Sequence, residues 1–457
     1  MTESNENATD RASVGRTRIM NIRLVQNFSL VWLDENIDLD NNNNDSLNTI
    51  IHLRQIVNNV RDFINIDECV DYITNIEHEK IFMVVSGQIG EIVVPKIHDL
   101  SQLSTIFVLC RRRQYHEQWA MNWPKIRGVH TNITSLCASL KEATHECDHN
   151  TVSISFARSP NDISDQKLDQ LDPSFMYTQI LKEILLTINF EEKHIDEFYA
   201  YCREQFAGNA VELQNIDKFR NEYHSHSPIW WYTYPCFLYS MINRALRMME
   251  VDLIIRMGFF ISDLHQEIAK LHAQQFVGHQ QSHLFHVYRG QAFSRVDFEQ
   301  LEKTQGGLIS FNNFLSTSRN PRVSFNFAES RIQDPNMIRT VLRIKIDPSV
   351  SSSPFANVKD VSYYTDEEEI IFSMHSVFRI GLIQELSANN RLWQVDLTLT
   401  SDSDPQLQRL TEKFRNETFL YEKRWLRLAS LLIKLGQFEK AEEACTAVLH
   451  QTIDNDE

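Results

Sequence analysis

Three short apolar runs in the first third of the chain constrain its fold more than any other feature. Polar residues hardly interrupt these runs, which is typical of strands buried on both faces of a parallel sheet. They are Phe28–Leu33, Lys80–Val85 and Thr105–Leu109. Helical patterns alternate with them, as from Leu47 to Val60, over about five β-α units. The sequence therefore predicts a doubly wound, three-layer α/β domain over residues 24–150, after a disordered leader over residues 1–23.

Polar residues follow these strands at the sheet edge where doubly wound domains bind their ligands. Asp34 and Glu35 follow the first strand, and Ser86-Gly87 closes the second. Arg111–Arg113 follows the third and could hold an anion, although such a run is more often a solvated loop. Neither a GxGxxG nor a GxxxxGK[ST] phosphate loop occurs. Because no complete phosphoacceptor or nucleotide site is recognisable, we expect this domain to be a sensor or a surface for protein partners.

The composition indicates folded domains and argues against nucleic-acid binding. The chain has 457 residues, of which 42% are hydrophobic and 10% aromatic, so it can build several cores. Its formal net charge is −16, from 45 basic and 61 acidic residues. A nucleic-acid binder normally shows a basic face, whereas a small anionic ligand needs only one well-placed arginine.

The cysteines and the apolar runs indicate the cellular compartment of the protein. The seven cysteines are scattered singly, without a CxxC pair or zinc-type spacing, so we expect reduced thiols and no metal site. Residues 1–16 lack the apolar segment of a signal peptide, and no run approaches the length of a membrane span. The sequence thus predicts an intracellular, cytoplasmic protein that does not contact a membrane.

A helical block and then a strand-rich block follow the first domain. Residues 151–172 are polar and are interpreted as a linker. From Phe175 to Phe276 apolar residues recur at helical spacing, and after Val277 short strands with turn residues replace them. Helices followed by an antiparallel or mixed sheet predict an α+β domain over residues 173–402. The aromatic group at Trp230–Tyr234 is interpreted as helical core rather than as a stacking platform.

The last segment, residues 405–457, contains apolar and small residues at the spacing of a tetratricopeptide repeat, W-x2-L-A followed by G-x-F-x2-A. The matching positions are Trp425, Leu428, Ala429, Gly436, Phe438 and Ala441. One repeat cannot bury its own faces, so this segment either caps the preceding domain or belongs to a longer array. An ordinary amphipathic helical hairpin fits the pattern equally well. A repeat here would offer a second surface to protein partners.

Two segments of the α+β region carry polar residues that suit a dinucleotide. Arg289 ends an apolar strand, and Gly290 follows, so a guanidinium fork and an accessible backbone lie together. In Phe314–Ser318, alternation places Ser316 and Ser318 on one face of a strand. Ser316 could bond a ribose hydroxyl or orient a carboxylate. Each signal alone is weak, because many strands end in Arg-Gly and a lone serine often caps a strand.

A third segment, Glu367–Glu369, runs directly into the apolar stretch Ile370–Phe372. Adjacent carboxylates repel one another and normally lie on solvated surfaces, whereas these residues lead into a predicted strand. Alternation would place Glu367 and Glu369 on one face and Glu368 on the other. Two carboxylates at the lip of a sheet can act on two reacting partners. Taken alone, an acidic loop before a buried strand is the simpler interpretation.

In combination and in this order, the three segments resemble the mono-ADP-ribosyltransferases of the Arg-Ser-Glu class. That class includes arginine-specific ecto-enzymes and related bacterial toxins. The resemblance covers roughly residues 175–400 and rests on Tyr288-Arg289-Gly290, Phe314–Ser318 and Glu367–Phe372. It implies a fold in which helices pack against a split β-core. It also implies that NAD is consumed as a substrate, so that no separate cofactor is needed.

The resemblance also implies how NAD would be bound. Arg289 matches the arginine that holds the diphosphate and ribose side of NAD. Gly290 would offer backbone groups to the nicotinamide amide, and Ser316 would position NAD and the catalytic glutamate. Phe327 would stack on the nicotinamide ring, although Phe325 and Phe327 both suit core packing.

The two outer carboxylates of the acidic segment receive different roles from the resemblance. Glu369 matches the catalytic glutamate, which would stabilise the oxocarbenium-like ribose as the bond to nicotinamide breaks. Glu367 matches the upstream glutamate that orients an arginine acceptor and helps to remove its proton. The segment Lys359–Asp366, with Tyr363 and Tyr364, would form the loop that faces the acceptor.

The sequence therefore predicts a mono-ADP-ribosyltransferase that moves ADP-ribose from NAD to a protein arginine and releases nicotinamide. An NAD glycohydrolase would use the same Arg289, Ser316 and Glu369, with water as the acceptor. A non-catalytic scaffold that binds NAD or a partner is the third hypothesis. The residues leave the choice between NAD and NADP, and the identity of the protein target, open.

Overall fold

The structure is a computed structural model of the chain. It describes residues 26–37, 44–76, 79–150, 152–157, 173–276, 283–329, 337–349, 353–365, 368–387, 392–401 and 403–417. In the C-terminal segment it describes residues 426, 429–430, 432–433 and 436–453.

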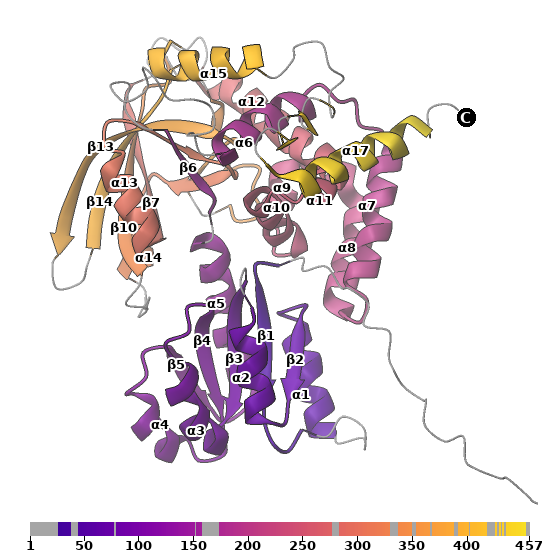
Figure 1. Cartoon of the computed structure of the whole chain (residues 1–457), viewed down its shortest axis with the longest axis vertical. Coiled ribbons are helices and arrows are strands. Elements are labelled where there is room, and N and C mark those ends of the chain that lie inside the picture. The colour runs from indigo at the N-terminus through magenta and orange to yellow at the C-terminus, as the bar shows by residue number, and fades with distance from the viewer. Residues whose placement is uncertain are drawn as a thin grey trace, which may run out of the picture.

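The first domain is built on a five-stranded parallel sheet in the order β2-β1-β3-β4-β5 (Figure 1). The strands are β1 (Phe28–Leu33), β2 (Val60–Phe63), β3 (Lys80–Ser86), β4 (Leu103–Leu109) and β5 (Ile126–His130). The helices are α1 (Asn44–Arg54), α2 (Ile66–Thr74), α3 (Gly87–Ile97), α4 (Arg113–Ala120) and α5 (Ile133–Asn150). We call β1 to α5 the α/β domain.

Alternating side chains of the apolar strands fill two separate cores, one on each face of this sheet. Leu30, Phe82 and Phe107 pack with α1 and α5 on one face. Val31 and Met83 pack with α2, α3 and α4 on the other face. Both faces are therefore covered by helices, which confirms the predicted parallel α/β domain and explains why its strands are almost wholly apolar.

The second domain contains a nine-stranded sheet in the order β11-β12-β9-β7-β10-β14-β13-β8-β6. The strands are β6 (Ile154–Ala157), β7 (Phe285–Ser294), β8 (Leu308–Phe311), β9 (Leu315–Ser318), β10 (Met337–Ile346), β11 (Phe355–Asn357), β12 (Glu369–Phe372), β13 (Ser376–Ser387) and β14 (Leu392–Leu399). Neighbours are antiparallel except for β10 and β14. β7 and β9 pair through Tyr288 and Ser318, so a single residue pair joins β11, β12 and β9 to the other six strands of the sheet.

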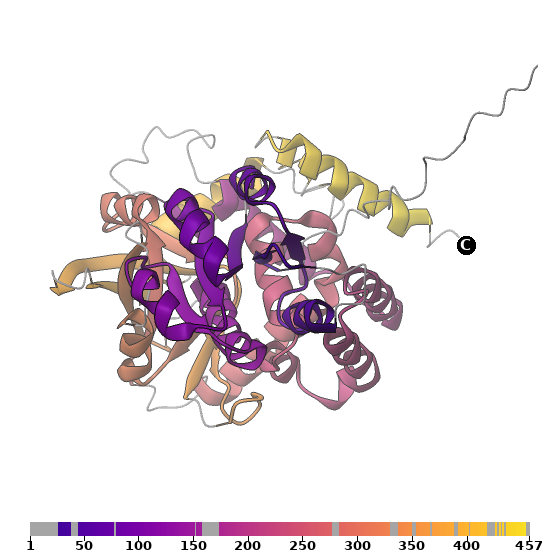
Figure 2. The ribbon, with the colours of Figure 1, turned by 90° about the horizontal axis from the view of Figure 1, so that it is seen from below.

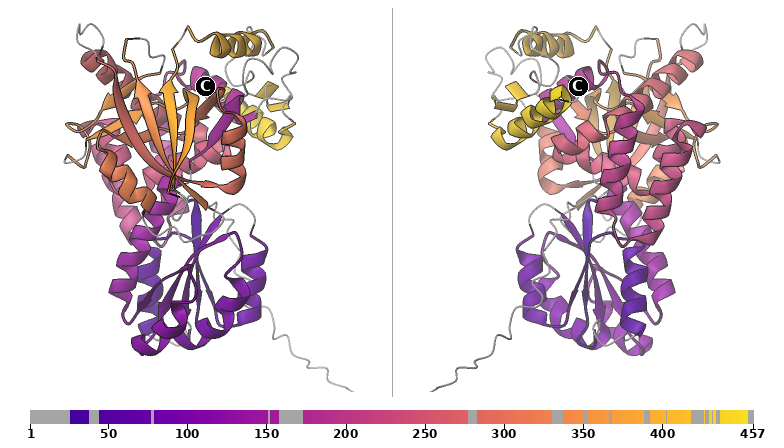
Figure 3. Two further views of the ribbon diagram at one scale, coloured as in Figure 1. Left: turned by 90° about the vertical axis from the view of Figure 1, so that its left-hand side faces the viewer. Right: turned by 90° about the vertical axis from the view of Figure 1, so that its right-hand side faces the viewer.

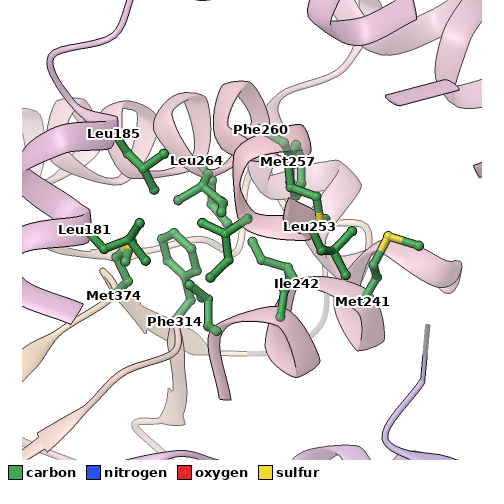
Figure 4. Packing of buried hydrophobic residues seen from close by; sticks show 14 of the residues in the cluster. Leu181, Leu185, Met241, Ile242, Leu253, Met257, Phe260, Leu264, Phe314 and Met374 are labelled. Atoms are coloured by element: carbon green, nitrogen blue, oxygen red, sulfur yellow. The ribbon is translucent and has the colours of Figure 1, made fainter. Parts of the chain in front are cut away.

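A helical block precedes most of this sheet in the chain and packs against it. Its helices are α6 (Pro173–Leu185), α7 (Glu192–Gln205), α8 (Ala210–Glu222), α9 (Pro228–Thr233), α10 (Phe237–Met248), α11 (Val251–Arg256) and α12 (Gly258–Phe276). Figure 4 shows apolar side chains of α6, α10, α11 and α12 meeting Phe314 and Met374 in one core. Trp231 and Tyr232 of the predicted aromatic group are buried in this core, whereas Trp230 and Tyr234 are half-buried and pack against it. The shorter helices α13 (Arg295–Lys303) and α14 (Pro321–Glu329) connect strands of the sheet.

Strand β6 lies within residues 151–172, the segment that was predicted to be a linker. It pairs with β8 at the edge of the nine-stranded sheet, and Ile154 and Phe156 pack against the core inside that sheet. A strand of four residues is too short to show a clear period of two in a polar segment. Because β6 follows α5 closely, the connection between the two domains is short.

The two domains lie one above the other. From the side, the parallel sheet stands below the nine-stranded sheet (Figure 3). From below, the α/β domain lies across the boundary between that sheet and the helical block (Figure 2). The carboxyl end of α5 therefore reaches the boundary between the nine-stranded sheet and the helical block.

The C-terminal segment packs on the helical block. Helix α15 (Pro405–Glu417) follows the sheet, and α17 (Phe438–Ile453) lies against α11, where Lys440 donates to the carbonyl of Met248 at 2.8 Å. Trp425 and Leu428 of the expected repeat lie outside the described residues. No tetratricopeptide repeat is evident in the described part of residues 405–457. Ala441 and Ala444 are buried in the core of the helical block, so α17 covers that core.

Over the described residues, no helix has both the length and the apolar character that crossing a bilayer requires.

Candidate active site

Three strands bring Arg289, Ser316 and Glu369 together. Arg289 lies on β7, Ser316 on β9 and Glu369 at the start of β12, and these strands are neighbours in the sheet. Nη1 of Arg289 donates to the carbonyl of Ser316 at 2.8 Å. The hydroxyl of Ser316 donates to Oε1 of Glu369. One serine therefore connects the guanidinium to the carboxylate through its backbone on one side and its side chain on the other.

The register of β9 and β12 explains this contact. Glu369 pairs with Ser318, and Ile371 pairs with Ser316, so these four side chains share one face of the sheet. Ile371 packs into the core of the helical block, and Glu369 at the strand end stays half-buried beside it. The hydroxyl of Ser318 accepts from the amide of Asn320 at 3.1 Å, which caps the strand end. Apolar packing thus fixes the direction in which Glu369 points.

Of the two remaining glutamates of the acidic segment, the structure describes Glu368 but not Glu367. Glu367 lies outside the described residues, so its place on the same face as Glu369 stays a prediction. The side chain of Glu368 is exposed, and its carbonyl accepts from the amide of Arg319 at 3.2 Å. The carbonyl of Glu369 accepts from the amide of Val358 at 3.0 Å, which ties β12 to the loop after β11.

The two other residues expected to contact nicotinamide are Gly290, next to Arg289 on β7, and Phe327, on the neighbouring helix α14. Gly290 is buried in β7 opposite Val341 of β10. Phe327 belongs to α14, but its side chain lies outside the described residues. Phe325 of the same helix packs with Tyr288 against Val341, so it serves the core.

Arg289 is buried, with 2% of its surface exposed. Besides the bond to Ser316, its Nε donates to Oε1 of Gln291 at 3.0 Å and its Nη2 donates to the carbonyl of His149 at 2.6 Å. Burial lowers the pKa of this guanidinium, and the charge of Glu369 opposes that shift. His149 belongs to α5, so the α/β domain supplies a partner to the arginine of the site.

Two tyrosines lie beside these groups, and neither was assigned a role in the site from the sequence. Tyr232 of α9 donates to the carbonyl of Phe314 at 3.3 Å, and burial, with the charge of Glu369 as a smaller cause, raises its pKa well above the ordinary range. Burial raises the pKa of Tyr239 of α10 to about 12, while the nearby charge of Arg289 acts in the opposite direction. Both phenols are therefore neutral donors near the site. They lie on different helices, so no spacing rule would have paired them.

The loop before the acidic segment is anchored to α9. The hydroxyl of Ser227 donates to the carbonyl of Val361 at 3.3 Å, and the amide of Tyr363 donates to the hydroxyl of Thr233 at 2.9 Å. The rings of Tyr363 and Trp230 meet edge-on with centroids 5.6 Å apart. Tyr363 and Tyr364 remain 41% and 47% exposed, so this loop presents two aromatic rings to the solvent.

Within the described part of the chain, no three His, Cys, Asp or Glu side chains are grouped so as to hold a metal ion.

Comparison with known protein families assigns the part of the chain that contains this site. Residues 213–401 match the family model described as ADP-ribosyltransferase exoenzyme. The match begins in α8, ends after β14 and includes Arg289, Ser316 and Glu369. This part of the chain is an ADP-ribosyltransferase domain that uses NAD. The α/β domain and α5 lie outside the matched residues.

Solved structures of bacterial ADP-ribosyltransferases are also similar to this chain. HopU1 of Pseudomonas syringae pv. Tomato DC3000 is 17% identical with a TM-score of 0.29, over 49% of this chain and 97% of its own. Exoenzyme S of Pseudomonas aeruginosa, solved with human 14-3-3 protein beta, is 18% identical with a TM-score of 0.29, over 47% and 96%. The Paenibacillus larvae toxin Plx2a is 14% identical with a TM-score of 0.28, over 45% and 96%. No curated protein matches the sequence.

Proposed function

We propose that the chain transfers the ADP-ribose group of NAD to an arginine of a protein acceptor and releases nicotinamide. The observation that carries the proposal is the hydrogen-bonded line from Arg289 through Ser316 to Glu369 inside an ADP-ribosyltransferase domain. NAD is the substrate in this scheme, and the residues of the chain supply the rest of the chemistry.

Glu369 is the proposed catalytic carboxylate. Breaking the bond between nicotinamide and ribose leaves positive charge on the sugar, and a fixed carboxylate stabilises that charge most when it is already oriented. The hydroxyl of Ser316 supplies the orientation by donating to Oε1. Ser316 thus acts by positioning Glu369.

Arg289, Gly290 and Phe327 are proposed to bind NAD. A guanidinium fork matches the oxygens of a diphosphate, and a strand backbone without a Cβ at Gly290 lets the nicotinamide amide approach. Phe327 would stack on the nicotinamide ring. Arg289 already donates to two backbone carbonyls and a glutamine, so a diphosphate has to compete for its donors.

Glu367 is the proposed acceptor-facing group. An arginine acceptor is cationic and a poor nucleophile, so a second carboxylate has to orient it and help to take up its proton. The anchored loop with Tyr363 and Tyr364 precedes Glu367 and offers exposed rings on which a guanidinium can stack. The α/β domain and residues 405–457 are proposed to contact protein partners.

The test is incubation of the full chain with labelled NAD and an arginine-rich protein, comparing the wild type with Glu369→Gln and Glu367→Gln. We expect Glu369→Gln to abolish nicotinamide release, because it removes the charge that stabilises the ribose cation. Glu367→Gln should reduce the mass shift on the acceptor far more than the release of free ADP-ribose.

The same experiment distinguishes the alternatives. Free ADP-ribose without any modified acceptor would identify an NAD glycohydrolase. NAD that is bound but consumed by neither the wild type nor Glu369→Gln would indicate a scaffold and contradict the proposal. A mass shift on lysine or asparagine rather than arginine would reject the acceptor assigned here.

A further inference from the structure

We propose that the carboxyl end of α5 occludes the NAD site, so that the α/β domain holds the transferase in a state of low NAD affinity. The inference rests on the proposed function, because it requires Arg289 to be the partner of the NAD diphosphate. It concerns residues that lie outside the part of the chain matched by the transferase family.

Helix α5 belongs to both domains. Leu136, Leu140 and Ala143, before its last two turns, pack against one face of the parallel sheet. Its last residues contact β7 of the transferase domain, and Figure 1 shows the helix leaving the α/β domain and ending beside the second sheet. Because the helix is continuous over 18 residues, a movement of the α/β domain is passed to its carboxyl end.

The end of α5 makes three hydrogen bonds to β7. Arg289 donates to the carbonyl of His149 at 2.6 Å, and Nε2 of Gln291 donates to the carbonyl of Asn150 at 2.7 Å. The side-chain oxygen of Asn150 accepts from the amide of Ala292 at 3.0 Å. These contacts fall on three residues within the stretch Arg289–Ala292 of β7.

The carbonyl groups at the end of α5 accept hydrogen bonds from β7 as the oxygen atoms of an anion would. The last carbonyls of a helix have no partner within the helix, and the helix dipole gives them a partial negative charge. Here Arg289 and Gln291 satisfy two of them. A diphosphate would seek the same guanidinium, so α5 and NAD compete for Arg289.

Because the residues of β7 that α5 contacts are buried, α5 and NAD cannot both occupy the space beside Arg289. Arg289, Gln291 and Ala292 are 2%, 3% and 4% exposed, so a ligand that contacts Arg289 has to displace what covers it. The covering element that belongs to the other domain is the end of α5. We infer that NAD binding needs this end to withdraw.

A second group of polar contacts holds α5 in place at the junction of the domains. Oδ1 of Asp148 accepts from Asn27 at 2.8 Å and from Ser240 of α10 at 3.1 Å. Arg247 of α10 donates to Asn27 at 2.9 Å, and Arg244 donates to the carbonyl of Gln26 at 3.1 Å. Hydrogen bonds therefore hold both the end of α5 and the residues just before β1 to α10, the helix that carries Tyr239.

The first test measures NAD binding to the full chain in an inactive Glu369→Gln background, so that NAD is not consumed. Asn150→Ala removes the bond to the amide of Ala292 and should lower the Kd for NAD by about fivefold, the effect of one buried hydrogen bond. Asn132→Ala is the matched control, because Asn132 caps the other end of the same helix through the amide of Ser135. This control should leave the Kd unchanged.

The second test remains informative if Asn150→Ala fails to fold. Hydrogen exchange of the Glu369→Gln protein is compared with and without saturating NAD. Occlusion predicts that NAD speeds amide exchange in residues 145–150, because the helix end is displaced. Slower or unchanged exchange there, with NAD bound, would overturn the occlusion and leave the proposed function intact. If NAD binds to none of these proteins, the proposed function fails and the occlusion fails with it.

Discussion

At the scale of single residues, Ser316 organises the site. Its carbonyl accepts from Arg289 and its hydroxyl donates to Glu369, so one residue orients both charges. The partners of Arg289 in this structure are a side-chain amide and two backbone carbonyls, which satisfy the guanidinium without neutralising it by a full negative charge. An anionic substrate can therefore still gain electrostatic energy from Arg289.

Ser316→Ala tests whether orientation of Glu369 matters. Loss of one hydrogen bond to a charged group should lower kcat for nicotinamide release by about 10- to 100-fold, with a smaller change in KM for NAD. Ser318→Ala is the control, since Ser318 lies on the same face but accepts a backbone amide. Equal effects of the two substitutions would argue against the assigned role.

At the scale of elements, β12 links the catalytic carboxylate to the core. Ile370 and Phe372 point into the core inside the sheet, whereas Ile371 points into the core of the helical block. Both faces of this short strand are therefore buried beyond Glu369. Burial of the apolar residues after the acidic segment fixes the position of β12. Glu369, the first residue of this strand, is left at the edge of the site.

Phe372→Ala should destabilise the protein by about 3–5 kcal/mol, because it removes a buried ring from a close-packed core. Phe372 is fully buried and meets the rings of Phe355 and Phe378, with centroids 5.5 and 5.4 Å away. Denaturant unfolding measures the change. Tyr364→Ala, at an exposed position of the preceding loop, should change the unfolding free energy by less than about 0.5 kcal/mol. A Phe372→Ala effect of the same small size would contradict this description of β12.

At the scale of the whole molecule, the two domains share a helix and a buried polar junction. Asp148 lies at that junction with Asn27, Ser240 and Arg247 around it. Burial raises the pKa of Asp148 from 3.8 to about 6, while the hydrogen bonds and Arg247 act in the opposite direction. The junction is therefore more stable with Asp148 protonated.

This shift predicts a pH dependence of stability that Asp148→Asn should remove. A raised native pKa contributes stability below the unfolded pKa of 3.8, and that contribution is lost as the pH rises through about 6. Between pH 4 and pH 7 the wild type should lose roughly 2–3 kcal/mol relative to Asp148→Asn. Unfolding of both proteins across this pH range measures the difference. Parallel stability curves would show that Asp148 does not carry the shift.

The sequence anticipated the parts of the fold that local patterns encode. The apolar runs predicted the parallel sheet of the α/β domain, and their near-continuity follows from burial on both faces. The Arg-Gly, Ser-Thr-Ser and Glu-x-Glu segments led to the transferase resemblance, which the family match to residues 213–401 confirms at the level of an NAD-dependent ADP-ribosyltransferase. Short β6 was missed, because four residues carry too little periodicity.

By itself, the sequence determined which residue types are available for chemistry and which segments become strands, because strand patterns and motifs are local. Only the tertiary structure decided what those residues touch. Sheet order placed Arg289, Ser316 and Glu369 side by side, and packing of α9 and α10 brought Tyr232 and Tyr239 to them. The contact of α5 with Arg289 joins residues 140 positions apart. No periodicity encodes such a contact, because it depends on how two domains dock.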